Sequence, residues 1–386
     1  MRRLLALALG ALALAGCGGA FDLPTETREG RTFSTDHSYQ MDLTWTNMDG
    51  IADILLTQGT GSQLFLLFKH DGVGLAPRGT VLGYALRAQP PTPAPLHGIE
   101  FHQLFVPAAL CGAKGRVFVL DEGDTCLARA NPGTGQCGDT TGGWRGDISD
   151  LNSYWHVRKY GLLGKDPLST FTDTSMAFVR GIAADDQGRL YVSGSAIRYT
   201  PSRTDPRIKT RELVFRIVRY RRINAGETPD PYMPGASGWI RDQSFEVEEG
   251  SGIGSLIDPH GIYWAGGNVP GGPASFAADF RKNWVQKLSD ATSSLGYFRI
   301  DIAQDTTLEG PEDVAADLSG YLYIADTGNH RVLRFDPYGQ FVQRVNVEPD
   351  AQGLALQQPV AVAADDSLVY VGDRALGRVI RYRRRK

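Results

Sequence analysis

Residues 310–345 read GPEDVAADLSGYLYIADTGNHRVLRFDPYGQFVQRV. Short apolar segments alternate in this stretch with turns that carry Asp, Gly, Asn or Pro. Apolar runs separated by such turn residues are typical of antiparallel strands joined by tight connections. The stretch therefore predicts one meander of four antiparallel strands.

The same order of strand and turn recurs along the chain. Copies begin near residues 42, 107, 180, 252, 310 and 359. Each has a large apolar or aromatic residue at one place on its second predicted strand: Leu55, Phe118, Tyr191, Tyr263, Tyr323 and Tyr370. Because these residues are unequally spaced while the strand pattern is constant, we predict a repeated unit with insertions in its connections.

The stretch 310–345 resembles an NHL repeat, in Tyr323-Ile324-Ala325-Asp326 and in Asn329-His330-Arg331-Val332. The resemblance implies a β-propeller, in which meanders pack radially and bury both faces of each sheet. We expect an all-β fold, a six-bladed β-propeller of four-stranded antiparallel blades, with five or seven blades as the alternative. In such a repeat the polar residues from Asp326 to Arg331 form a turn that satisfies backbone groups.

The ring needs a strand from outside the last copy. That copy supplies only three strands, at about 359–364, 368–373 and 377–383, before the sequence ends. Residues 31–38 precede the first copy and are available as the fourth strand. Joining the two ends hides both open sheet edges, so we predict that 31–38 pairs with the last strand.

The predicted connections differ between the two faces of the propeller. The turns between first and second strands are all short: NMDG, AKG, DDQG, DPHG, DLSG and DDS. Most long segments fall on the opposite face: 88–98, 161–177, 200–212, 224–251, 265–282 and 346–358. The exception is 131–152, which we place after a third strand. Since elaborated loops carry function, the long-loop face is the expected working face.

The N-terminus has the order of an export signal. Arg2 and Arg3 precede an apolar run, Leu4–Leu14, that is shorter than the roughly 20 residues needed to cross a bilayer. Leu14-Ala15-Gly16-Cys17 resembles the bacterial lipobox, and Gly18 after the cysteine implies sorting to the outer membrane. The predicted organisation is a lipoprotein signal peptide (1–16), lipidation at Cys17, a flexible tether (17–30) and an NHL-type β-propeller (31–386). We expect a lipid-anchored protein at the outer membrane, facing the periplasm or the cell surface.

The charge balance limits the partners. Lys and Arg number 40 against 43 Asp and Glu, for a net charge of −3 over 386 residues. This argues against a nucleic-acid binder that relies on a basic surface. We expect a protein, peptide or glycan ligand, membrane contact through the lipid anchor, and no nucleic acid.

Six positions are expected to face the central channel from the long-loop side: Asp42, Pro107, Arg180, Ile253, Glu312 and Val360. One base with two acids makes a poor cage for a divalent metal but a suitable polar binding spot. Long loops also carry aromatic residues suited to interface anchoring, namely Phe101, Tyr232, Trp239 and Phe276. The predicted ligand-binding residues are Asp42, Arg180, Glu312 and Trp239, and no catalytic residue is assigned.

Two other patterns involve cofactors and cysteines. Asn47-x-Asp49-Gly50-x-x-Asp53 resembles part of a calcium loop, although Asn-x-Asp-Gly is also an ordinary strand turn. We expect no cofactor and keep calcium, with Asn47, Asp49 and Asp53, as the alternative. The predicted strands place Cys111 and Cys126 about 9.5 Å apart, beyond disulfide reach. Any disulfide should therefore join Cys137 to Cys111 or to Cys126.

The leading hypothesis is a non-catalytic binding or scaffold module that uses its long-loop face. The alternative is a hydrolase or lyase of the propeller class, resembling lactonases, with a site at the channel mouth. His260, in Asp258-Pro259-His260-Gly261, is interpreted as a turn residue.

Overall fold

The computed structural model describes residues 39–57, 63–69, 79–85, 100–102, 104, 106–122, 155–201, 209–233, 238–250, 255–266, 269, 272–289, 294–298, 307–346 and 355–385. The chain divides into Met1–Asp36 and His37–Lys386, and all the described residues belong to the second unit. No helix among them is both long and apolar enough to cross a membrane.

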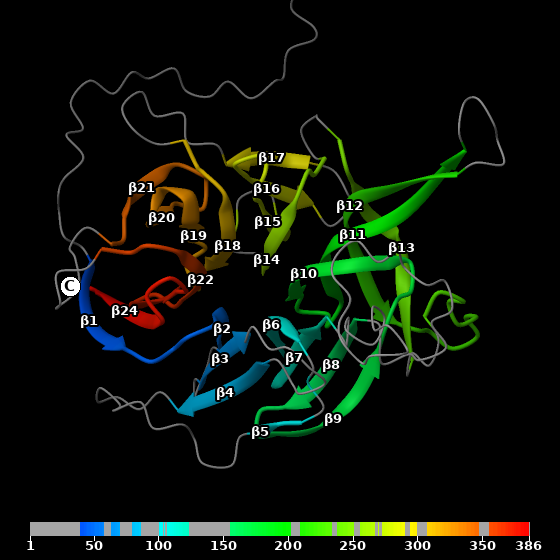
Figure 1. The fold of residues 1–386 in the computed structure, drawn as a ribbon, viewed down its shortest axis with the longest axis horizontal. Helices are drawn as coiled ribbons and strands as arrows, with labels where there is room; N and C mark the ends of the chain where they lie inside the picture. Colours follow the sequence, from blue (N-terminus) through cyan, green and yellow to red (C-terminus); the bar gives the residue numbers. More distant parts are fainter. Residues whose placement is uncertain are drawn as a thin grey trace, which may run out of the picture. The chain divides into compact units, whose positions relative to one another are not determined.

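Six antiparallel meanders surround a centre, as Figure 1 shows. Blade 1 contains β2 (Ile51–Leu56), β3 (Gln63–Lys69) and β4 (Gly79–Ala85). Blade 2 contains β6 (Pro107–Ala113), β7 (Arg116–Asp121), β8 (His156–Gly161) and β9 (Gly164–Phe171), with β5 (Glu100–Phe101) parallel to β9. Blade 3 contains β10 (Met176–Ala184), β11 (Leu190–Pro201), β12 (Lys209–Arg222) and β13 (Trp239–Glu248).

The second half continues the pattern. Blade 4 contains β14 (Pro259–Ala265), β15 (Ala274–Asp279), β16 (Trp284–Ser289) and β17 (Ser294–Phe298). Blade 5 contains β18 (Pro311–Ala316), β19 (Leu322–Asp326), β20 (Arg331–Phe335) and β21 (Phe341–Arg344). Blade 6 contains β22 (Pro359–Ala364), β23 (Leu368–Asp373), β24 (Arg378–Arg384) and β1 (Tyr39–Trp45). The prediction of an all-β, six-bladed propeller is confirmed. Four blades have four strands, and the described parts of blades 1 and 2 have three and five.

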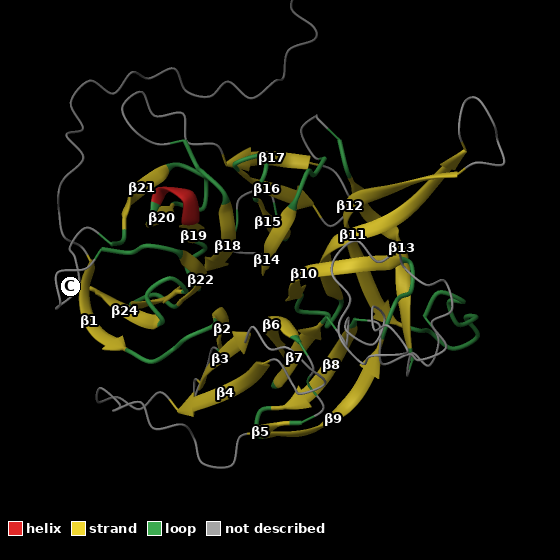
Figure 2. Ribbon diagram, viewed as in Figure 1, coloured by secondary structure: helices red, strands yellow, loops and turns green. Residues whose placement is uncertain are grey.

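The core lies between blades, because each sheet packs apolar side chains on both faces. Several strands are buried along their whole length, namely β15, β19, β20 and β22. Separate apolar clusters fill the spaces between neighbouring blades. The one helical turn among the described residues is η2 (Thr327–Asn329), which Figure 2 shows between β19 and β20.

The ring closes through β1, which takes the place predicted for residues 31–38; those residues lie outside the described part of the chain. β1 pairs antiparallel with β24, Tyr39 opposite Arg384 and Trp45 opposite Val379. Both carboxylate oxygens of Asp42 accept hydrogen bonds from Arg381 (2.8 and 2.9 Å), and Oδ2 also accepts one from Arg383 at 2.7 Å. The prediction that the first inner strand begins near residue 42 is therefore wrong. That strand instead begins at Ile51, after a connection that contains the NMDG turn.

Three other strand assignments also change. In blade 4 the inner strand is β14, so DPHG lies at its start and the first-to-second connection is 266–273. In blade 2, β8 is the third strand, so 131–152 belongs to the connection between second and third strands. That removes the exception to the long-loop face. The connection 223–238 joins β12 to β13 and lies on the opposite face.

We call the face with first-to-second and third-to-fourth connections the short-connection face, and the opposite one the long-connection face. At the long-connection end, four second strands close with a fully buried aspartate: Asp121, Asp279, Asp326 and Asp373. Asp326 accepts the backbone N–H of Glu309 at 2.7 Å and Arg331 Nε at 2.6 Å. The predicted structural role of this turn is confirmed.

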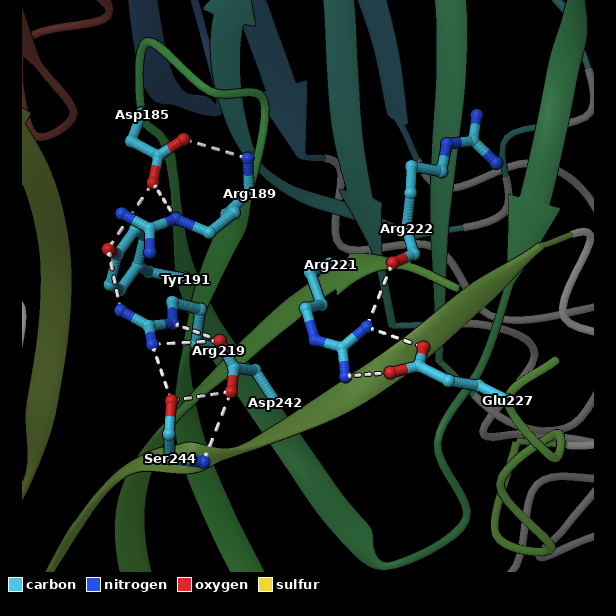
Figure 3. A network of polar contacts seen from close by, with 9 residues as sticks. All are labelled: Asp185, Arg189, Tyr191, Arg219, Arg221, Arg222, Glu227, Asp242 and Ser244. Carbon is cyan, nitrogen blue, oxygen red and sulfur yellow. Dashed lines mark hydrogen bonds and ion pairs between the residues drawn. The ribbon is translucent and has the colours of Figure 1, made fainter. Parts of the chain in front are cut away.

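At the short-connection end, three blades share an Asp–Tyr–Arg triad. In blade 5, Tyr323 donates to Asp317 Oδ2 at 2.9 Å, and Arg334 Nε donates to Tyr323 Oη at 3.1 Å. Figure 3 shows the triad of blade 3, where Asp185, Tyr191 and Arg219 continue to Asp242 and Ser244. In blade 6 the corresponding residues are Asp365, Tyr370 and Arg381. In blades 3 and 5 these polar groups tie the first turn to the second and third strands, whereas Arg381 of blade 6 pairs with Asp42.

Candidate functional site

The inner strands enclose a central channel with a volume of ≈ 1000 Å³. All six strands β2, β6, β10, β14, β18 and β22 contribute to its wall. Polar side chains gather at its mouth on the long-connection face. This mouth is the candidate site.

The second residue of the inner-strand repeat forms one ring around the mouth. Its members are Ala52, Ala108, Arg180, His260, Glu312 and Val360. The polar members come from three consecutive blades, 3, 4 and 5, whereas the apolar ones come from blades 6, 1 and 2. One half of the mouth is therefore charged and the other half is small and apolar.

Arg180 has no hydrogen bond or ion pair with the described residues and is exposed to the channel. Beside it, His260 Nε2 lies 3.5 Å from Asp258 Oδ1, and Arg281 Nε lies 3.2 Å from Asp258 Oδ2. Desolvation raises the pKa of Asp258, but the interaction with His260 and the charges of Arg180 and Arg281 together bring it below its usual range. Asp258 thus stays ionised and orients the His260 ring.

The remaining rim is made of opposite charges from neighbouring blades. Arg374 lies 3.7 Å from Glu312, and Lys69 donates to Glu122 at 2.8 Å. The Arg374 and Lys69 side chains are 41% and 38% exposed, so their pairs are weak and a ligand can displace them.

Two aspartates lie one residue deeper in the channel wall. Asp53 accepts the N–H groups of Ile54 and, in blade 2, of Leu110. Asp313 accepts those of Val314 and, in blade 6, of Val362. Desolvation raises the pKa of Asp53 to about 7 and that of Asp313 well above its usual value, and the charge of Asp53 adds to the effect on Asp313. Their hydrogen bonds join adjacent blades.

The structure brings some predicted residues together and separates others. Arg180, Glu312 and Val360 line the channel as expected. Asp42 does not, because it lies on the outermost strand β1 and pairs with arginines of β24. Trp239 is 3% exposed and packs on Phe171 in the core, so it is not available to a ligand.

Other predicted positions shift as well. The channel positions of blades 2 and 4 are Ala108 and His260, not Pro107 and Ile253, and Ile253 lies outside the described residues. Among the predicted loop aromatics Phe101 and Phe276 are buried, whereas Tyr232 is 58% exposed.

His260 is the site residue that sequence reasoning missed. The pattern Pro259-His260-Gly261-Ile262 corresponds in register to Pro311-Glu312-Asp313-Val314 of blade 5. A proline followed two residues later by a small or acidic residue and then by an aliphatic one was the available signal. We overlooked it because Asp-Pro-x-Gly is also an ordinary turn sequence.

No group of three or more His, Cys, Asp or Glu side chains among the described residues is arranged to hold a metal ion. In the alternative calcium motif, Asp53 already accepts two backbone N–H groups, while Asn47 and Asp49 lie in the connection before β2. Cys111 is a buried free thiol whose pKa is raised by desolvation. Cys126 and Cys137 lie outside the described residues, so a disulfide of Cys137 stays a prediction.

Comparison with known proteins agrees with the repeat and the fold. Residues 308–335, which include β18 to β20, match the NHL repeat model. A search of curated proteins finds no significant match.

Similar solved structures include two forms of virginiamycin B lyase from Staphylococcus aureus. One is a catalytically inactive form with quinupristin (10% identity, 89% of this chain and 99% of that chain, TM-score 0.43). The other is selenomethionine-substituted (9% identity, 89% and 99%, TM-score 0.45). A protein of unknown function from Bacteroides caccae is also similar (10% identity, 81% and 83%, TM-score 0.42). The chain is a six-bladed β-propeller with an NHL repeat in its fifth blade.

Proposed function

We propose that the protein is an exported, lipid-anchored binding module that holds a peptide segment at the channel mouth of its long-connection face. Cys17 carries the anchor at the outer membrane in this proposal, and the propeller presents the site. A larger protein or a glycan that offers the same groups is the broader class of ligand. The proposal rests on the observation that one half of the channel mouth is charged and the other half is small and apolar.

The chemistry of the mouth favours a peptide. Arg180 offers a guanidinium for a carboxylate, and Glu312 offers a carboxylate for an N–H or ammonium group. Val360, Ala52 and Ala108 form an apolar wall on the other side. A peptide carries anionic, N–H and apolar groups within a few ångströms of one another, so it matches both halves.

A peptide-array or pull-down experiment with the purified protein tests this proposal. Arg180→Gln and Glu312→Gln should each weaken capture of the selected peptides about tenfold, since each removes a charge-assisted hydrogen bond. Arg384→Gln, which removes an exposed charge on β24 at the opposite end of the propeller, is the matched control. Equal capture by all variants would show that the mouth is not the ligand site.

A hydrolase or lyase is the second candidate, favoured by the His260–Asp258 pair. A histidine oriented by a carboxylate beside a channel is a suitable general base. Ester and lactone substrates test this, with His260→Ala expected to abolish turnover while far-ultraviolet circular dichroism is unchanged. A wild-type protein without turnover, or an active His260→Ala variant, removes this candidate.

A further inference from the structure

The hairpin of β11 and β12 is longer than the blade that holds it. The two strands pair without interruption along their whole length. On one side β10 begins opposite Ala196 of β11, and on the other side β13 ends opposite Arg216 of β12. Residues 197–201 and 209–215 therefore extend beyond the blade at the long-connection end, and Figure 1 shows them projecting from the ring. We call this part the projecting hairpin.

One edge of the projecting hairpin presents backbone groups in a known direction. The backbone N–H of Phe215 donates to Glu249 Oε2 at 3.1 Å, so it points away from β11. Because successive residues of a strand turn their N–H and C=O groups to opposite sides, Leu213, Arg211 and Lys209 turn theirs the same way. No strand among the described residues pairs with this part of β12. The edge therefore offers a row of N–H and C=O groups to another strand.

Carboxylates already occupy the base of this edge. Glu249 accepts the N–H of Phe215, as a carbonyl oxygen of an added strand would. The preceding residue, Glu248, lies 3.1 Å from Arg198 of β11 and 3.6 Å from Arg216 of β12. These two acids are the last residue of β13 and the residue after it. An acidic strand placed beyond them would continue the same pattern of backbone and arginine contacts.

The charge of the hairpin favours an acidic partner. Residues 198–212 contain five Lys or Arg against two Asp or Glu. A second copy of the chain would bring its own basic hairpin to the edge, and like charges on facing strands are destabilising. A strand that carries carboxylates brings opposite charges instead. Leu213, which is 43% exposed, and the half-buried Phe215 add apolar groups beside the edge, so the partner should alternate acidic and apolar residues.

We infer that the edge of β12 from Lys209 to Leu213 is a docking surface for an extended acidic peptide segment, which adds to the sheet of blade 3 as a further strand. In this mode of recognition the main-chain hydrogen bonds supply affinity, and the charge of the hairpin supplies selectivity. The surface is separate from the ring of residues at the channel mouth. It does not depend on the ligand proposed there.

The test uses the full chain with Cys17→Ser, so that the predicted acylation does not contribute. Fluorescence anisotropy measures binding of short capped peptides in which Glu alternates with Val or Thr. Two companion peptides have Gln in place of Glu, or a methyl group on every backbone nitrogen.

The double variant Arg211→Pro with Leu213→Pro removes two N–H groups from the edge, where proline is tolerated. Arg211→Ala with Leu213→Ala is the matched control, because it changes the same side chains and keeps both N–H groups. Thermal unfolding compares the stability of the two variants.

The Glu peptide should bind the parent chain about tenfold more tightly than the Gln peptide. The proline variant should weaken this binding about thirtyfold and the alanine variant at most about fivefold. The N-methylated peptide should not bind the parent chain, a result that does not depend on how the variants fold. Equal binding by the two variants, binding of the N-methylated peptide, or no binding of the Glu peptide would each overturn the inference.

Two further outcomes identify a different arrangement. A Glu peptide that is lost by Arg180→Gln but kept by the proline variant binds at the channel mouth, which overturns this inference and leaves the proposed function standing. A dimer of the parent chain in sedimentation velocity that the proline variant abolishes assigns the edge to a second copy of the chain, which also overturns it.

Discussion

Blades 5 and 2 agree at one end and differ at the other. At the long-connection end, Asp326 accepts a backbone N–H and Arg331 Nε, and Asp121 likewise accepts the N–H of Val106 (2.8 Å) and Arg158 Nε (3.0 Å). At the short-connection end, blade 5 has Asp317 with its Tyr and Arg, whereas blade 2 has Ala113 there. The aspartate at the long-connection end bonds each of these two blades to the chain that precedes it. The triad at the short-connection end, by contrast, is present in blade 5 and absent from blade 2.

This difference separates two uses of buried charge. A cation paired with a buried acid is structural, because its energy comes from within the fold. Lys159, which pairs in register with Phe118 in blade 2, has Ala113 in place of that acid, so its charge adds little to the stability of the fold. Four predictions examine this distinction, from the largest expected effect to the smallest.

The long-connection end, where both blades have a buried aspartate, should be equally important for the stability of both blades. Asp326→Ala and Asp121→Ala each leave a buried guanidinium, Arg331 or Arg158, without its acid. Each should lower the free energy of unfolding by about 3–5 kcal/mol, measured by urea denaturation. Asp366→Ala, which removes an exposed carboxylate bonded to Ser319, should cost less than about 1 kcal/mol. A small loss for either core variant would contradict the structural role.

At the short-connection end, where the two blades differ, matching substitutions should change the stability of the protein to different extents. Arg334→Met in blade 5 leaves Asp317 and the hydroxyl of Tyr323 without their base and should cost about 2–3 kcal/mol. Lys159→Met in blade 2 should change stability by less than about 0.5 kcal/mol in anion-free buffer, because no acid depends on it. Thermal and urea unfolding of the two variants provide the measurement. Equal losses of stability in the two variants would contradict the proposed difference between the blades.

Blade 6 adds an intermediate case, since the acid that pairs with Arg381 comes from β1. Hydrogen bonds with Arg381 and Arg383 outweigh desolvation and lower the pKa of Asp42. A lowered pKa in the folded state stabilises the protein above the ordinary value of about 4, and this contribution disappears as the pH falls through the folded pKa. Asp42→Asn should therefore cost about 1–3 kcal/mol at pH 7 and progressively less as the pH falls below about 4. A pH-independent difference would show that the pair does not depend on the ionised carboxylate.

The smallest effect comes from restoring the missing acid. Ala113→Asp puts a carboxylate where Asp317 stands in blade 5 and should stabilise the protein by about 0.5–1 kcal/mol by pairing with Lys159. Urea denaturation measures this effect, and a variant less stable than the wild type would show that the carboxylate at position 113 does not pair with Lys159.

The sequence predicted the number of blades because strand and turn patterns are local. It also predicted Arg180 and Glu312 at the channel, since their copies are complete. It misplaced Asp42 because the inner strand of blade 1 and the closing strand both read as short alternating segments, and only pairing distinguishes them. It missed His260 because Asp258-Pro259-His260-Gly261 also reads as an ordinary turn, although it lies at the start of the inner strand β14.

By itself, the sequence determined the repeat, since hydrophobic period and turn residues act over a few positions. Only the tertiary structure decided which side chains meet: Arg180, His260 and Glu312 at one mouth, and Asp42 with Arg381 where the ring closes. These residues are far apart along the chain, and their proximity depends on ring closure and on the register of strands. A one-residue change of register would turn each of them to the other face of its sheet, so local sequence cannot specify the sites.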